Sequence, residues 1–203
     1  TNQNKLNFTL QGGGTLTLNG ANTLAGTTTV QGASTLILDS NLANSAVTVG
    51  GAGAGTLVSN QTITGLLTVS SGGVVAPGDV LAAEIATLTL NGGLTLNTGG
   101  ILAMQIGSSA GLTAPLVNDK FLITGGVLTI SGGQISLSEL TPGGSVGAVI
   151  GLGDYSLIDY AGASNAAAFA AGSQFSNLGL ASSVIGTNNY FVTLVHDTAN
   201  KII

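Results

Sequence analysis

The strongest candidate for acid–base chemistry in this sequence is its single histidine. His196 lies in the alternating run Phe191–Asp197, and the adjacent Asp197 would face the opposite side of a strand. A catalytic triad needs a nucleophilic serine and an orienting acid beside the imidazole, and no Gly-x-Ser-x-Gly turn precedes a predicted helix. We therefore expect a structural role for His196, at a strand end or in a capping region.

Carboxylates are the next candidates, and there are eight: Asp39, Asp79, Glu84, Asp119, Glu139, Asp154, Asp159 and Asp197. Glycosidase chemistry would need two of them about 5–9 Å apart. Asp154 and Asp159 are an odd number of positions apart, so on one strand they would face opposite sides. Four of the eight, Asp119 among them, lie beside Ser, Gly or Asn, which is typical of turns. We predict no catalytic residues and no enzymatic activity.

Metal and cofactor motifs are also missing from the sequence. It has no cysteine, no Gly-Gly-x-Gly-x-Asp calcium repeat and no EF-hand loop. The glycine-rich run Gly50–Gly55 leads into Thr56 rather than a helix, and it lacks the lysine of a phosphate-binding loop. We therefore predict neither a metal site nor a bound cofactor.

Composition excludes further classes. The 203 residues include three lysines and no arginine, and only 5% are charged, for a net charge of −5. Three cations cannot neutralise a row of phosphates, which argues against nucleic-acid binding and against a polybasic membrane patch. No apolar run reaches the roughly 18 residues of a membrane-spanning helix, so we expect no membrane insertion. With 44% hydrophobic residues, the chain should form a packed interior.

Internal repetition is the main signal for the fold. Short runs of Thr, Leu and Val with period two recur about every 20 residues in two interleaved sets, separated by glycine-rich turns. The first set is Thr15–Leu18, Thr35–Leu38 and Thr56–Ser59. The second set is Thr27–Val30, Ala46–Val49, Leu66–Val69 and Thr87–Leu90.

Parallel coils explain this repeat better than a meander of antiparallel hairpins. Likeness is strongest at the full repeat, and charges are too few to mark a solvated sheet face. Runs such as Leu36–Leu38 place apolar residues on consecutive positions, as in buried parallel sheets. We predict an all-β fold, a parallel β-solenoid over residues 1–140, with Thr15, Thr35 and Thr56 in an outward ladder.

The remainder, residues 141–203, differs in composition. Aromatic residues collect there, and we expect a less regular, β-rich C-terminal cap. Its closing strands are predicted at Tyr155–Tyr160 and Tyr190–His196, with a short helix around Ala166–Ala171.

The segment Gly14–Val30 resembles the autotransporter-associated β-strand repeat, found in passenger regions of bacterial surface and secreted proteins. The likeness continues in Gly72–Gly78, which looks like that family's Gly-Gly-x-x-Ala-Pro-Gly turn, and in Asn118–Gly125 and Gly153–Tyr160. It implies a right-handed parallel β-helix, exported to the bacterial surface or medium, with an architectural or adhesive role. The sequence shows no membrane β-barrel translocator, so the export route is open.

Two functional hypotheses follow, from different classes. In the first, the chain is a structural subunit that self-associates head to tail by strand addition, through Leu6, Phe8 and Leu10 at one end and Phe191 and Leu194 at the other. In the second, it is an adhesin module that binds a surface glycan through Tyr155, Asp159 and Tyr160. A carbohydrate-active enzyme remains the third alternative, because many parallel β-helices have that activity; it would need a carboxylate pair across one groove.

Overall fold

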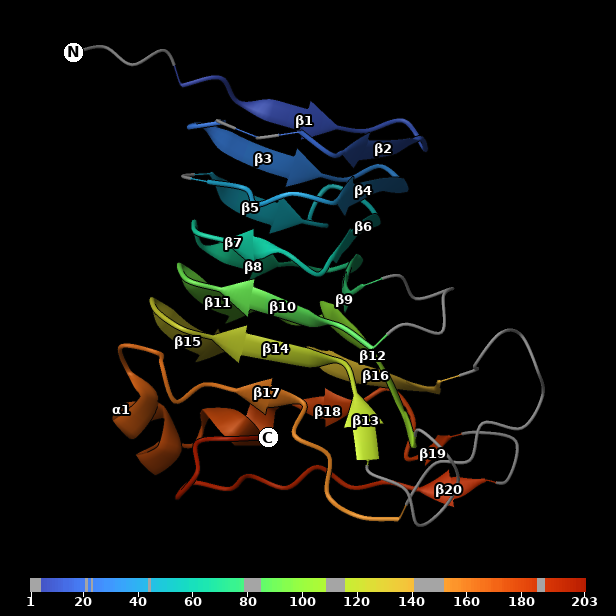
Figure 1. Ribbon diagram of the computed structural model, residues 1–203, viewed down its shortest axis with the longest axis vertical. Helices are drawn as coiled ribbons and strands as arrows, with labels where there is room; N and C mark the ends of the chain where they lie inside the picture. The colour runs from blue at the N-terminus through green and yellow to red at the C-terminus, as the bar shows by residue number, and fades with distance from the viewer. Residues whose placement is uncertain are drawn as a thin grey trace.

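The protein is a stack of parallel strands that form three sheets along a common axis (Figure 1). The computed structural model describes residues 5–20, 22, 24–43, 45–78, 85–108, 116–140, 152–185 and 189–203. The first strand, β1, lies at one end of the stack, and helix α1 lies near the other end (Figure 1).

Two of the sheets run almost the full length of the stack. Sheet A contains, in spatial order, β1 (Phe8–Leu10), β3 (Thr27–Val30), β5 (Ala46–Val49), β8 (Leu67–Val69), β11 (Gly93–Leu96) and β15 (Val127–Ile130). Sheet B contains β2 (Thr15–Leu18), β4 (Ser34–Leu38), β6 (Gly55–Ser59), β9 (Gly73–Pro77), β12 (Ile101–Ser108), β16 (Gln134–Glu139) and β18 (Gly179–Leu180).

Sheet C is narrower, and the C-terminal region adds a few short elements. Sheet C contains β7 (Thr62–Ile63), β10 (Thr87–Leu90), β14 (Lys120–Ile123) and β17 (Ile158–Asp159). The other elements are β13 (Leu116–Asn118), helix α1 (Ala166–Ala171), the 3-10 helix η2 (Gln174–Asn177) and the antiparallel pair β19 (Val184–Ile185) and β20 (Tyr190–Phe191). Strand β13 pairs antiparallel with the end of β12.

From β6 to β15, each turn of the chain visits sheet B, then sheet C, then sheet A. The succession β9, β10, β11 is one example, and β12, β14, β15 is the next. Within each of these sheets, neighbouring strands pair in parallel. This confirms the all-β class and a parallel stack consistent with a β-solenoid.

Alternation along each strand separates the core from the surface. From β3 onward, the inward positions of sheet A form an apolar column whose members are all 0–1% exposed: Val30, Val49, Val69, Leu96 and Ile130. The intervening outward positions form a column of threonines: Thr9, Thr29, Thr48, Thr68, Thr95 and Thr129. In sheet B, the pairing of Thr15 with Thr35 and of Thr35 with Thr56 confirms the predicted ladder.

Coil length is not constant, and this makes one sequence assignment wrong. Val47 pairs with Leu67, but Leu67 pairs with Leu94 and Leu94 with Leu128, so the coils lengthen from about 20 to about 27 and then 34 residues. The run Thr87–Leu90, which we grouped with the second set, is strand β10 of sheet C. The true continuation of that set is Gly93–Leu96. The longer connection between β9 and β10 shifts the phase of the repeat.

Glycine allows the coils to approach closely at their corners. A Cβ on Gly65 would lie 2.0 Å from the carbonyl oxygen of Ser45 in the preceding coil, and one on Gly55 would lie 2.2 Å from that of Val30.

The segment Gly72–Gly78, which resembles a turn of the autotransporter-associated repeat, differs from expectation. Its residues Gly73–Pro77 form strand β9, which pairs in register with β6. One of the two valines in β9 is buried and the other is half-buried, so this strand alternates between inward and outward positions like its neighbours in sheet B.

The C-terminal region contains the predicted helix, Ala166–Ala171, but its strands are shorter than predicted. Only Ile158–Asp159 of the first predicted strand and Tyr190–Phe191 of the second have strand pairing. Within the part of the chain that the structure describes, no helix is long and apolar enough to cross a membrane.

Candidate functional site

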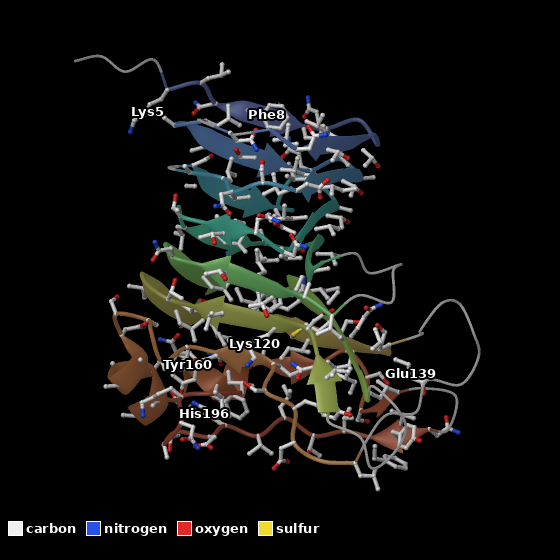
Figure 2. The ribbon with its side chains drawn as sticks, viewed as in Figure 1. Lys5, Phe8, Lys120, Glu139, Tyr160 and His196 are labelled. Atoms are coloured by element: carbon white, nitrogen blue, oxygen red, sulfur yellow. The ribbon has the colours of Figure 1, made fainter. Side chains whose placement is uncertain are left out.

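Tyr160 and His196 meet beneath the last coils, on the inside of the C-terminal region (Figure 2). The Tyr160 hydroxyl lies 2.6 Å from Nε2 of His196, and Tyr160 itself is 0% exposed. The imidazole stacks on the ring of Phe175 at 4.7 Å and meets the edge of Phe169 at 5.7 Å. His196 therefore joins the C-terminal segment to the helical part of the cap.

Burial sets the electrostatics of this cluster. It raises the pKa of Tyr160, with a smaller contribution from Asp197. It lowers the pKa of His196, against the opposing effect of the Asp197 carboxylate. Backbone and side-chain hydrogen bonds from Asn200 lower the pKa of Asp197. Burial thus favours the neutral form of the imidazole, which packs between aromatic rings and shares one hydrogen bond with Tyr160.

The three residues proposed to contact a glycan do not form one surface. Tyr160 is buried in the cluster just described. Asp159 is half-buried, pairs with Leu122 in sheet C and accepts a hydrogen bond from the backbone of Ala161 at 3.1 Å. Tyr155 is half-buried and donates its hydroxyl to the carbonyl of Gly107 at 3.2 Å. Of the three, Tyr155 alone lines the cavity between sheet B and the C-terminal segment.

That cavity, of about 260 Å³, lies between the ends of sheet B and the C-terminal segment. Aliphatic side chains form most of it, with Asp154 as its one carboxylate among the described residues. Phe191 and Leu194, predicted for assembly, both line it. The Phe191 side chain is 84% exposed and Leu194 is half-buried, because successive residues of this extended segment face opposite sides. The cavity can accept a small apolar group.

Two of the three N-terminal residues predicted to donate a strand already pair within the chain. Phe8 and Leu10 belong to β1, which pairs in parallel with β3 through Phe8–Thr28 and Leu10–Val30. Leu6 precedes the strand and is 66% exposed. Donating this segment to a neighbour would break its own pairing with β3.

Among the described residues, the first coil is less buried than the second. Leu16 pairs with Leu36, and Leu18 with Leu38, in the same register and on the same inward face. Leu36 and Leu38 are 0% and 1% exposed, whereas Leu16 and Leu18 are only partly buried. The difference arises because, in the part of the chain that the structure describes, the second coil has neighbours on both sides and the first coil has one.

The opposite end of sheet A is closed by side-chain amides, a feature that the sequence analysis missed. Asn165 donates to the carbonyl of Leu128 at 2.8 Å and accepts from its amide at 2.9 Å. The Ile130 amide donates to Gln174 at 3.0 Å, and its carbonyl accepts from Asn177 at 3.1 Å. The free edge of β15 is therefore saturated without another strand. The sequence signal that could have revealed this closure is the presence of Asn and Gln in the helix and turn that follow the last repeat.

Sheet C is closed in another way. The C-terminal residues return antiparallel to β17, with mutual hydrogen bonds between the backbones of Ile158 and Ile203 at 3.0 and 2.9 Å. Tyr160 also donates its amide to the carbonyl of Lys201 at 3.0 Å. The C-terminal end of the stack is thus capped at sheets A and C.

Asp119 differs from the turn residue that we predicted. Its carboxylate is 0% exposed, with Oδ1 accepting from the Ala86 amide at 2.9 Å and Oδ2 from the Gln105 amide at 2.8 Å. It joins strand β12 to the residue that precedes β10. Asp79 and Glu84 lie outside the described residues. Among the described residues, no three His, Asp or Glu side chains gather in a way that could hold a metal ion.

Comparison with known proteins adds no family assignment. No protein-family model matches this chain, and neither does any of the curated proteins searched.

Proposed function

We propose that this protein is a non-enzymatic structural element of the bacterial surface, a β-solenoid segment of a stalk or fibre. The observation that carries the proposal is the continuity of the stack. Parallel pairing extends through six strands of sheet A and through seven of sheet B, over an uninterrupted apolar core. Such a stack resists bending and local opening because each strand is hydrogen-bonded to the coils beside it.

Location at the cell surface is supported by the resemblance of Gly14–Val30 to the autotransporter-associated repeat and by the composition. Three lysines and no arginine leave few positions for trypsin-like proteases. We also propose that the coils are right-handed, because connections between parallel strands of one sheet almost always have that hand.

An adhesin role is the second candidate, and one observation favours it. The cavity beside Tyr155 is flanked by three exposed apolar side chains: Leu152 at 76%, Phe191 at 84% and Val195 at 66%. A surface ligand with a small apolar group, such as a deoxy or acetylated sugar, would fit this lining better than a fully hydroxylated one.

Negative-stain electron microscopy and a glycan array on the purified chain test the proposal together. We expect uniform short rods and no saturable glycan binding. Glycan binding that Phe191→Ala abolishes, with an unchanged far-UV circular dichroism spectrum, would overturn the structural role in favour of the adhesin. The matched control is Thr198→Ala, which is exposed on the same C-terminal segment but does not line the cavity.

A further inference from the structure

We infer that residues 192–195 are an edge strand, which binds an extended segment of a partner protein that carries apolar and basic side chains. This inference goes beyond the structural role, and it holds whether or not the solenoid is part of a fibre. It assigns a peptide, rather than a glycan, to the cavity beside Tyr155. Backbone pairing, side-chain pattern, cavity lining and charge each support it.

The backbone after β20 has a free edge. The chain there runs along the C-terminal end of the stack (Figure 1), and the Val192 amide donates to the carbonyl of Ser183 at 3.0 Å, on the side of β19. Alternate residues of a strand direct their backbone groups to opposite sides, so those of Thr193 and Val195 point away from β19. Among the described residues, the backbones of residues 193–195 have no hydrogen-bond partner. An incoming strand would satisfy them.

The side chains of this run have the pattern of an unprotected strand. Phe191, Thr193 and Val195 are exposed. Val192 and Leu194, between them, are half-buried. β-branched and aromatic residues, which favour strands, make up most of the run. It contains neither a charged residue nor a proline, the features that keep other strands from pairing with the edges of soluble proteins.

The cavity accepts a side chain from such a partner. Its volume is about 260 Å³, and its lining includes Ile106, Leu137 and Leu157. An apolar cavity of about 150 Å³ already holds a benzene-sized group, so a branched aliphatic or aromatic side chain fits here. Because residues 192–195 also line the cavity, one added strand can pair with their edge and fill the cavity.

Charge favours a basic partner over a second copy of this chain. Asp154 is exposed and is the one carboxylate of the lining among the described residues, which contribute no lysine to it. Asp197 follows the edge by two positions. A second copy, with its net charge of −5, would bring like carboxylates together. A lysine on the partner strand would instead pair with Asp154.

Isothermal titration calorimetry of the purified chain tests the inference. The probe is the acetylated and amidated peptide Lys-Val-Thr-Val-Thr-Val-Lys, whose terminal lysines allow either strand direction. We expect saturable binding of one peptide per chain. Two derivatives carry N-methyl groups on alternate amides, in the two possible phases. A strand pairs through one edge at a time, so one derivative should lose about tenfold in affinity and the other should keep it.

Hydrogen exchange followed by NMR locates the contact. Peptide binding should slow the exchange of the Thr193 and Val195 amides about tenfold, because these amides point to the free edge. The amide of Thr198, exposed beyond the edge, is the control and should not change. This measurement uses the unaltered chain, so it does not depend on whether a variant folds.

Asp154→Asn tests the charge contribution. It should weaken binding of the lysine peptide about threefold, the effect of an exposed ion pair, and leave unchanged the affinity of a peptide with norleucine in place of both lysines. Asp39→Asn is the matched control, since Asp39 is exposed and does not line the cavity. Equal effects of Asp154→Asn on the two peptides would contradict the ion pair and with it the basic partner.

Several results would overturn the inference. They are the absence of saturable binding below about 1 mM, equal losses in both N-methylated derivatives, and unchanged exchange at Thr193 and Val195. Dimers in light scattering that Phe191→Ala abolishes would identify a second copy as the occupant. Octylamine that binds as tightly as the peptide would identify an alkyl ammonium ligand without strand pairing. None of these results concerns rods or glycans, so the inference and the proposed function can fail separately.

Discussion

Replacing the buried carboxylate of Asp119 tests how the longer coils are held together. Its two oxygens accept backbone hydrogen bonds from Ala86 and Gln105, at 2.9 and 2.8 Å, in a position with no exposed surface. Asp119→Ala would leave two buried amide donors without this acceptor. The loop before β10 and the end of β12 would lose their common anchor.

The expected magnitude follows from these two bonds. Each buried donor left unpaired costs about 1–3 kcal/mol, and removing the carboxylate offsets part of that loss because its own burial is unfavourable. We expect a net loss of about 3 kcal/mol in the free energy of unfolding. With a urea dependence of about 2 kcal/mol per molar, the unfolding midpoint should fall by roughly 1.5 M.

Urea titration at neutral pH, followed by far-UV circular dichroism, measures this change. Asp39→Ala is the matched control, because Asp39 is exposed in the turn after β4. Asp119→Asn keeps the shape of the side chain but turns an amide donor toward one of the backbone donors, so it should recover less than half of the loss. A midpoint for Asp119→Ala within about 0.25 M of the Asp39→Ala midpoint, or about 0.5 kcal/mol, would refute the anchoring role.

Three further predictions concern the corners and the cap. Gly65→Ala places a Cβ 2.0 Å from a carbonyl oxygen of the preceding coil, so it should lower the free energy of unfolding by about 3 kcal/mol in the same urea titration. The control Gly14→Ala, which has no atom within 4 Å of the added Cβ, should change it by less than about 0.5 kcal/mol. Burial lowers the pKa of His196, so protonation of this imidazole favours the unfolded state. The cap should therefore keep its stability above about pH 6.5 and lose it as the pH falls below that value. Equal hydrogen-exchange protection of the cap at pH 7.5 and pH 5 would contradict this. Asn165→Ala removes two hydrogen bonds to the edge of β15 and should destabilise the cap by about 2 kcal/mol. Asn177→Ala removes one such bond and should have about half that effect. Hydrogen exchange of β15 measures the ratio of the two effects, and equal effects would argue against saturation of this edge.

Local patterns in the sequence were sufficient for most strands. The period-two runs of Leu, Val and Thr identify β2, β4, β6 and the strands of sheet A before β11, because alternation of side chains is a property of each strand alone. The outward ladder of Thr15, Thr35 and Thr56 follows from the repeat, since equal spacing brings equal residues into register. The alanine-rich run Ala166–Ala171 identifies the helix for the same local reason.

Sheet membership needed the tertiary structure. The run Thr87–Leu90 has the pattern of its predecessors, but the longer connection after β9 places it in sheet C. A repeat with constant period cannot reveal such a shift, because an insertion at a corner leaves the strand patterns on both sides unchanged.

The candidate functional residues were the least predictable from the sequence. Tyr155, Asp159 and Tyr160 are close in the sequence, yet one borders a cavity, one caps a turn and one is buried against His196. Sequence patterns predicted the parallel stack and the apolar interior, because side-chain alternation and the 20-residue repeat are both visible in the chain itself. Only the tertiary structure decided that sheets A and C are capped at the C-terminal end and that Asp119 is buried, because those contacts join residues that are far apart in the sequence.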